Sequence, residues 1–131
     1  GITIVSSFTT PFIGELVGKN KWRVFKEFDY HVGSYPSLEI IHVPVGFITN
    51  FASVPKIFWF LISPIDAHGK AAVVHDYLYT IGYSKKSVCD KIYLEALTVL
   101  KVSKIKRIIL YYGVKYFGWC NWFKCRIKDY L

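Results

Sequence analysis

The sequence KAAVVHDYLYTIGYSKKSVCDKIYLEALTVL, residues 70–100, decides how the rest of the chain is organised. Its pattern predicts two helices joined by a tight turn. Helix-forming residues and an apolar stripe mark a first helix at residues 71–80, and Gly82 ends it because glycine adopts left-handed backbone without penalty. Ser84 is the expected N-cap of a second helix that runs to about residue 100. The stretch therefore predicts an antiparallel helix hairpin.

Polar side chains fall at matching heights in this hairpin. His75 precedes the turn by about as many residues as Asp90 follows it, so an antiparallel arrangement places the two side by side. Tyr79 lies one helical turn after His75 and points from the same face. Asp76 projects from a different side, about 100° around the helix, and is free for a separate task such as holding a cation.

The His75–Asp90 pair suits acid–base chemistry. A carboxylate that accepts a hydrogen bond from one ring nitrogen of histidine fixes the tautomer and raises the basicity of the other nitrogen. His75, Asp90 and Tyr79 are therefore the candidate catalytic residues. The alternative is a satisfied polar contact between two packed helices, with no chemistry attached. Both interpretations stay open at this stage.

Composition predicts a single domain spanning residues 1–131. Hydrophobic residues make up 53% of the chain and aromatic residues 18%, enough to build a core without metal or disulfide bonds. We expect no transmembrane segment, because no window holds 18 uninterrupted apolar residues, and no signal peptide, because the sequence opens on the strand-like ITIV. Cys89, Cys120 and Cys125 are too few for a disulfide framework, which favours a reducing compartment.

The net charge of +8 is concentrated near the end of the chain. Residues 101–128 contain eight Lys or Arg and no Asp or Glu, interleaved with tryptophan. Such a block suits an anionic membrane surface or, less well, nucleic acid, for which no recognised module is present. The alternative is a solvated helix face above an aromatic core. The candidate surface residues are Lys104, Lys106, Arg107, Lys115, Trp119, Trp122, Lys124, Arg126 and Lys128.

Residues 1–66 predict a sheet followed by a polar loop. Residues 1–43 read as a small antiparallel sheet with strands at 2–5, 11–17, 21–28 and 38–43, because β-branched and aromatic residues are frequent there. Residues 44–66 form a polar loop and a short helix that starts after Pro55. Within the loop, Thr49, Asn50 and Ser53 are expected to hold the backbone or a ligand. Asp66 is the candidate cap of the next helix.

Residues 67–131 form the helical part. Ser103 is the expected N-cap of a third helix at residues 104–117, which Gly118 closes before a short amphipathic tail. The third helix has an apolar stripe, and its opposite side carries lysine and arginine and is expected to face the solvent. Strand and helix signals are segregated along the chain, which predicts an α+β fold with the sheet packed on the helices. The stripe consists of Ile105, Ile108, Ile109, Tyr112 and Tyr116.

Four segments in order, VPVGFITNFASVP (43–55), HDYLY (75–79), DKIYLEAL (90–97) and YFGW (116–119), carry a specific resemblance. They resemble a family of phage and prophage proteins labelled domain of unknown function 1353. The resemblance implies a bacteriophage or prophage source. It departs at Asn50, where the family pattern has aspartate.

A fainter resemblance is to secretory phospholipases and to the phospholipase domain of parvovirus capsids, which carry an H-D-x-x-Y helix beside a helix with a further aspartate. It implies that His75 is the base that activates water, that Asp90 orients it, and that Tyr79 supports Asp90. It also implies that Asp76 holds calcium. The glycine-rich calcium loop of those enzymes is missing, since the preceding loop has only Gly46.

Two classes of function follow. The first is a membrane-directed lipid hydrolase of the His–Asp type, with a Ser53–His75–Asp90 triad as a lower-ranked variant. The alternative is a non-enzymatic phage protein, either a virion component of tail or baseplate or a host-interaction protein, in which the polar network only braces the fold. The expected partners are other virion proteins or an anionic membrane, and the expected location is the virion or the host cytoplasm.

Overall fold

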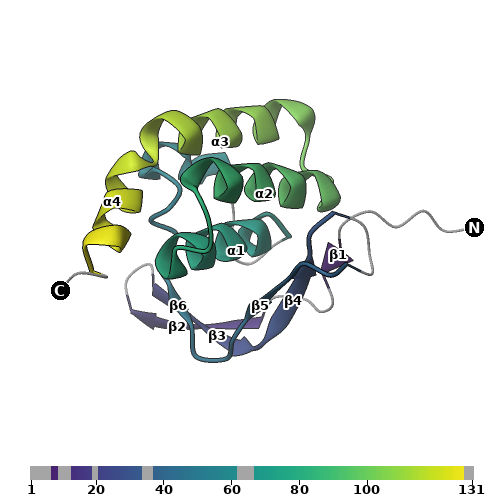
Figure 1. Ribbon diagram of the computed structural model, residues 1–131, viewed down its shortest axis with the longest axis vertical. Helices are drawn as coiled ribbons and strands as arrows, with labels where there is room; N and C mark the ends of the chain where they lie inside the picture. Colours follow the sequence, from purple (N-terminus) through teal and green to yellow (C-terminus); the bar gives the residue numbers. More distant parts are fainter. Residues whose placement is uncertain (1–6, 9–12, 19–20, 34–36, 62–66, 129–131) are drawn as a thin grey trace, which may run out of the picture.

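The computed structural model describes residues 7–8, 13–18, 21–33, 37–61 and 67–128. It has the predicted α+β fold, with antiparallel strands on one side and helices on the other (Figure 1). The strand expected at residues 2–5 and the cap expected at Asp66 lie outside the described residues. The elements are β1 (Ser7–Phe8), β2 (Ile13–Gly18), β3 (Lys21–Lys26), β4 (Phe28–His31), β5 (Ile40–Val43), β6 (Ile48–Thr49), the 3₁₀ helix η1 (Lys56–Leu61), α1 (Ala67–Ile81), α2 (Lys86–Val99), α3 (Lys104–Phe117) and α4 (Trp119–Lys128).

The described strands form two three-stranded antiparallel sheets, in the orders β1-β4-β5 and β2-β3-β6, where one small sheet was expected. Strand β3 alternates as predicted, because Val24 is buried while Lys21 and Arg23 are exposed. Strand β6 falls in the segment that was predicted to be loop, and there Thr49 pairs with Trp22 of β3. The polar loop therefore begins as a sheet edge, which fixes the position of the residues that follow.

Helix α1 is the central element of the helical part. It packs against α2 and α4 on one side and against β5 and β6 on the other (Figure 1). Contact on both sides explains why the residues from Ala71 to His75 are all fully buried. Gly82 ends the hairpin's first helix with a positive φ of 64°, as its sequence position predicted.

The helix starts agree with the sequence in one case and differ in another. Ser103 caps α3 as predicted, with its side chain accepting a hydrogen bond from the Lys106 amide. The prediction that Ser84 caps α2 is wrong by one residue, because Lys85 occupies the N-cap without a side-chain cap. Its carbonyl accepts from the amides of Val88 and Cys89, which starts the helix there. Lys86 is thereby placed in the first turn of α2.

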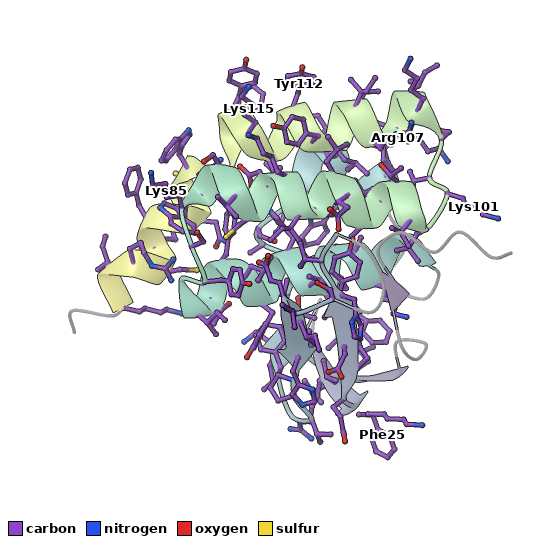
Figure 2. The ribbon with its side chains drawn as sticks, turned by 45° about the vertical axis from the view of Figure 1, so that its right-hand side comes forward. Phe25, Lys85, Lys101, Arg107, Tyr112 and Lys115 are labelled. Atoms are coloured by element: carbon purple, nitrogen blue, oxygen red, sulfur yellow. The ribbon has the colours of Figure 1, made fainter. Side chains whose placement is uncertain are left out.

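The apolar stripe of α3 points outward, which reverses the expected orientation of this helix. Its buried residues are Leu110, Gly113 and Val114 instead. A Cβ added at Gly113 would lie 2.8 Å from the ring of Phe58 in η1, so the missing side chain lets η1 pack directly against the helix. Figure 2 shows Tyr112 pointing away from the body of the protein. The predicted stripe thus leaves a line of large apolar side chains at the surface.

Candidate functional site

The His75–Asp90 contact forms between α1 and α2 as predicted. The Nε2 atom of His75 lies 2.7 Å from Oδ1 of Asp90, and the hydroxyl of Tyr79 donates to the same oxygen at 2.6 Å. His75 is fully buried, with its ring centroid 4.3 Å from that of Tyr79 and 4.6 Å from that of Tyr93. The equal spacing of the two residues from the turn is what brings them together.

Lys86 completes the coordination of Asp90 and was not anticipated from the sequence. Its Nζ lies 2.7 Å from Oδ2 of Asp90, one turn along α2. The same ammonium donates to the carbonyl oxygens of Val114 at 2.7 Å and Lys115 at 3.1 Å, at the end of α3. All three donors of the ammonium are therefore used, which is the condition under which a buried lysine is tolerated.

The start of α4 packs directly against this network. A Cβ added at Gly118 would lie 3.0 Å from the Tyr79 hydroxyl and 2.4 Å from the Val114 carbonyl oxygen, so glycine is needed between α3 and α4. The Lys86 ammonium lies 4.7 Å from the centroid of the Trp119 ring, and the Trp122 ring packs edge-on against Tyr79 at 5.1 Å. The aromatic residues that follow Gly118 therefore cover the buried charges.

Asp76 is engaged by the polar loop, which corrects the expectation that its side chain is free. Its Oδ2 accepts from the Thr49 hydroxyl at 2.6 Å and its Oδ1 from the Ser53 amide at 3.2 Å. Thr49 and Ser53 are both fully buried. Phe51, between them, adopts a positive φ of 58°, a strained conformation for a non-glycine residue. The loop is thus wrapped around one carboxylate of α1.

The third loop candidate, Asn50, behaves differently. Its side chain is exposed and accepts from the amide of Ala52 at 2.9 Å, which forms a local turn. The loop therefore presents Thr49 and Ser53 to the core and Asn50 to the solvent. Asn50 thus holds the backbone of the loop, one of the two roles expected for it.

The pKa values of the two buried aspartates are shifted in opposite directions. Burial alone raises the pKa of a carboxyl group, but hydrogen bonds from His75, Lys86 and Tyr79 reverse the effect for Asp90 and lower its pKa below the ordinary value. Burial dominates at Asp76 and raises its pKa despite the hydrogen bonds from Thr49 and Ser53. Burial, with the Asp90 charge adding to it, also raises the pKa of Tyr79, so the hydroxyl stays protonated and donates.

These contacts do not fit a calcium site at Asp76. Calcium takes about six to eight oxygen ligands, and both oxygens of Asp76 already accept hydrogen bonds. Within the described part of the chain, no group of three or more His, Cys, Asp or Glu side chains is placed to hold a metal ion.

The network comes closest to the surface at Lys86 and Asp90. Both residues line a surface pocket of about 620 Å³. Its other lining residues include Lys85, Lys115, Tyr116, Trp119 and Trp122. His75 lies beyond this lining and is fully buried. Its Nδ1 atom makes no hydrogen bond to any of the described residues. The arrangement thus buries a ring nitrogen that has no hydrogen-bond partner in the described part of the chain.

The predicted anionic-surface residues separate into two groups. Arg107 donates to the Val102 carbonyl in the connection between α2 and α3, Arg126 donates to carbonyls at the end of α1, and Trp122 is half-buried against Tyr79. The others are exposed on α3 and α4. The exposed members are Lys104, Lys106, Lys115, Trp119, Lys124 and Lys128.

Trp119 was predicted to lie on this surface, but the apolar residues of α3 that accompany the cations were expected to face the core. We define the aromatic face as Ile105, Ile109, Tyr112, Tyr116, Trp119 and Phe123, all of them exposed on α3 or α4. Within it, Tyr112 stacks on Tyr116 and Trp119 on Phe123, with centroid distances of 6.0 and 5.5 Å. The available signal was Gly113, since a glycine within a helix often marks the side of close packing. In the part of the chain described, no helix is long and apolar enough to cross a membrane.

The fold and the network define a small α+β protein with a buried His–Asp pair inside a helix hairpin. The chain belongs to the family described as protein of unknown function (DUF1353), whose model matches residues 22–114. This match confirms the resemblance carried by the loop and helix motifs. No curated protein and no solved structure matches the chain. The resemblance to phospholipases stays a prediction.

Proposed function

We propose that this chain is a phage or prophage protein that docks on an anionic membrane surface through its aromatic face, while the His75 network braces the helices beneath. The phage source rests on the motif resemblance described above. The observation that carries the docking is the exposure of the apolar stripe of α3, with Ile105 at 73% and Tyr116 at 61%. Transfer of side chains of this size from water to a lipid interface is favourable in free energy.

The charges around the aromatic face support the same proposal. Helices α3 and α4 contain no acidic residue, and their exposed lysines flank the apolar side chains. Near an anionic bilayer each such cation contributes about 1 kcal/mol of attraction, which salt weakens. Tyrosine and tryptophan prefer the interfacial region, because one end of each ring system is apolar and the other polar. A cationic and aromatic surface of this composition suits the lipid headgroup layer.

The complete pairing of Asp90 supports the bracing role of the network. The carboxylate accepts from His75, Tyr79 and Lys86 together, and Lys86 also holds the end of α3. The helices that present the aromatic face are thereby tied to the hairpin. The network's contribution to function is then a fixed geometry of that surface.

Vesicle sedimentation tests the docking. We expect binding to vesicles that contain phosphatidylserine, weaker binding to phosphatidylcholine vesicles, and a steep loss at high salt. The double substitution Ile105→Ser and Tyr112→Ser should reduce binding at least about tenfold, since two buried side chains are worth several kcal/mol. Phe25→Ser is the matched control, because Phe25 is 63% exposed on the opposite side of the protein (Figure 2). Equal loss in both variants, or no binding by the unmodified chain at low salt, refutes the proposal.

The second candidate is a lipid hydrolase with His75 as its base. One observation favours it: Nε2 of His75 is held by Asp90 while Nδ1 has no partner among the described residues. A ring nitrogen in that state is the atom that would accept a proton from water. Fatty-acid release from vesicles by the unmodified chain, lost in His75→Ala, would favour this candidate. Absence of release in a well-folded protein, with lower thermal stability in His75→Ala, favours the brace.

A further inference from the structure

A second pocket of about 540 Å³ lies away from the His–Asp network and has a strongly cationic lining. It is formed by the start of β3, the polar loop, η1, the end of α3 and the first turns of α4. Three of its lining residues are lysines and none is acidic. We name it the lysine pocket; its lining residues are Lys21, Asn50, Ala52, Val54, Pro55, Lys56, Trp59, Phe117, Cys120, Asn121 and Lys124.

We propose that the lysine pocket binds a phosphate-bearing anion. Lys21, Lys56 and Lys124 come from three separate elements and line one cavity, and their charges give it a positive potential that attracts an anion. Lysine ammonium groups bind phosphate as point charges, with three donors each. The cluster thus matches the charge of a phosphate group.

The neutral lining gives the pocket directional donors. Because Oδ1 of Asn50 accepts from the amide of Ala52, the side-chain amide NH₂ is the end that donates to a ligand. Asn121 supplies a second amide from α4. Amides paired with lysines favour an oxyanion that accepts several hydrogen bonds over a halide ion.

An aromatic wall adjoins the cations. The indole of Trp59 donates to the Val54 carbonyl at 2.7 Å, which fixes the orientation of its ring. The Lys56 ammonium lies 5.7 Å from the centroid of that ring. A fixed aromatic face beside a phosphate subsite suits a phosphate ester that carries an apolar or aromatic group. Such an ester is either a free small molecule or a lipid headgroup.

Calorimetric titration with phenyl phosphate tests the proposal at low ionic strength. We expect saturable binding, weakened about tenfold in Lys56→Gln and in Lys124→Gln, because each removes one charged hydrogen-bond donor. Lys91→Gln is the matched control, since Lys91 is exposed on α2 and does not line the pocket. Asn50→Asp retains the acceptor for Ala52 and places a negative charge in the cavity, so it should abolish binding.

Vesicles that contain phosphatidic acid separate the two sources of phosphate. In the Ile105→Ser and Tyr112→Ser background, in which docking through the aromatic face is weakened, residual vesicle binding that is lost on adding Lys56→Gln identifies a lipid headgroup. Binding of phenyl phosphate in solution, with vesicle binding unaffected by Lys56→Gln, identifies a free ester. The proposal is overturned if phenyl phosphate is not bound and Lys56→Gln leaves vesicle binding unchanged, or if Lys91→Gln weakens binding as much as the pocket variants. Thermal melting of each variant shows that the fold is retained.

Discussion

Lys86 and Asp90 lie one helical turn apart on α2 and form an ion pair that is shielded from water, with side-chain exposures of 4% and 2% and an N–O distance of 2.7 Å. A pair in this environment stabilises a fold only while both charges are present, because either charge alone is buried without compensation. This relationship decides how the site responds to substitution and to pH.

Replacing Asp90 by asparagine should lower the free energy of unfolding by about 3–5 kcal/mol, because Lys86 then remains buried without a counter-charge. Urea denaturation at pH 7 measures the change. Asp29→Asn is the matched control, since Asp29 pairs with His42 at the surface and should cost less than about 1 kcal/mol. In the double variant Lys86→Met and Asp90→Asn, part of the loss should be recovered. Equal losses in Asp29→Asn and Asp90→Asn would show that the pair is not shielded.

The stabilisation by Asp90 should depend on pH in the acid range. The folded-state pKa of Asp90 lies below the ordinary 3.8 that applies to the unfolded chain, so the folded state loses this proton more readily. The contribution is therefore fully present above pH 3.8 and is lost as pH falls through the folded-state pKa. The difference in unfolding free energy between the unmodified chain and Asp90→Asn should shrink below pH 3.8. A difference that is constant from pH 2 to 6 contradicts the lowered pKa.

Replacing Gly113 by alanine should destabilise the protein by about 1–3 kcal/mol, because the new methyl group would overlap the Phe58 ring. Helix propensity alone predicts the opposite sign, a gain of about 1 kcal/mol. Thermal unfolding of Gly113→Ala therefore distinguishes packing from propensity. In a Phe58→Leu background, the smaller side chain should reduce the loss. A more stable Gly113→Ala variant would mean that η1 does not pack against α3 as described.

Replacing Lys70 by methionine should stabilise the protein at neutral pH. Burial lowers the pKa of Lys70 from 10.5 to about 8, so keeping it charged in the folded state costs free energy below that pH. The unmodified chain should gain stability as pH rises from 8 towards 10.5, and the advantage of Lys70→Met should shrink over the same range. Lys91→Met, at an exposed position of α2, should show no such trend. Destabilisation by Lys70→Met at pH 7 would contradict the expected gain in stability.

The hairpin and its His75–Asp90 contact followed from the sequence because they depend on local information. Gly82 fixes the turn, and antiparallel helices of regular geometry then place equidistant residues together. Lys86 was missed because lysine is rarely buried, and its partners Val114 and Lys115 are distant in sequence. The specific contact between Asp76 and Thr49 was not predicted, because the two residues are distant in sequence and the loop motif does not show which carboxylate it contacts.

The orientation of α3 was predicted wrongly for a different physical reason. A periodic apolar stripe shows that a helix is amphipathic, but it does not show which side meets a partner within the same chain. The buried side of α3 is set by Phe58, which packs against the backbone at Gly113 where there is no side chain. The spacing of apolar residues along a helix does not predict long-range packing of this kind.

Two helix ends in this protein are each held by a cation from another helix. Arg126 of α4 donates to the carbonyls of Tyr79 and Thr80 at the end of α1, and Lys86 of α2 does the same at the end of α3. Helix ends ordinarily fray, which lets their amides exchange hydrogen with solvent through small local openings. Here the last turns of α1 and α3 open only if a neighbouring helix moves away, so their slowest amides should exchange with deuterium at the rate set by unfolding of the whole helical part.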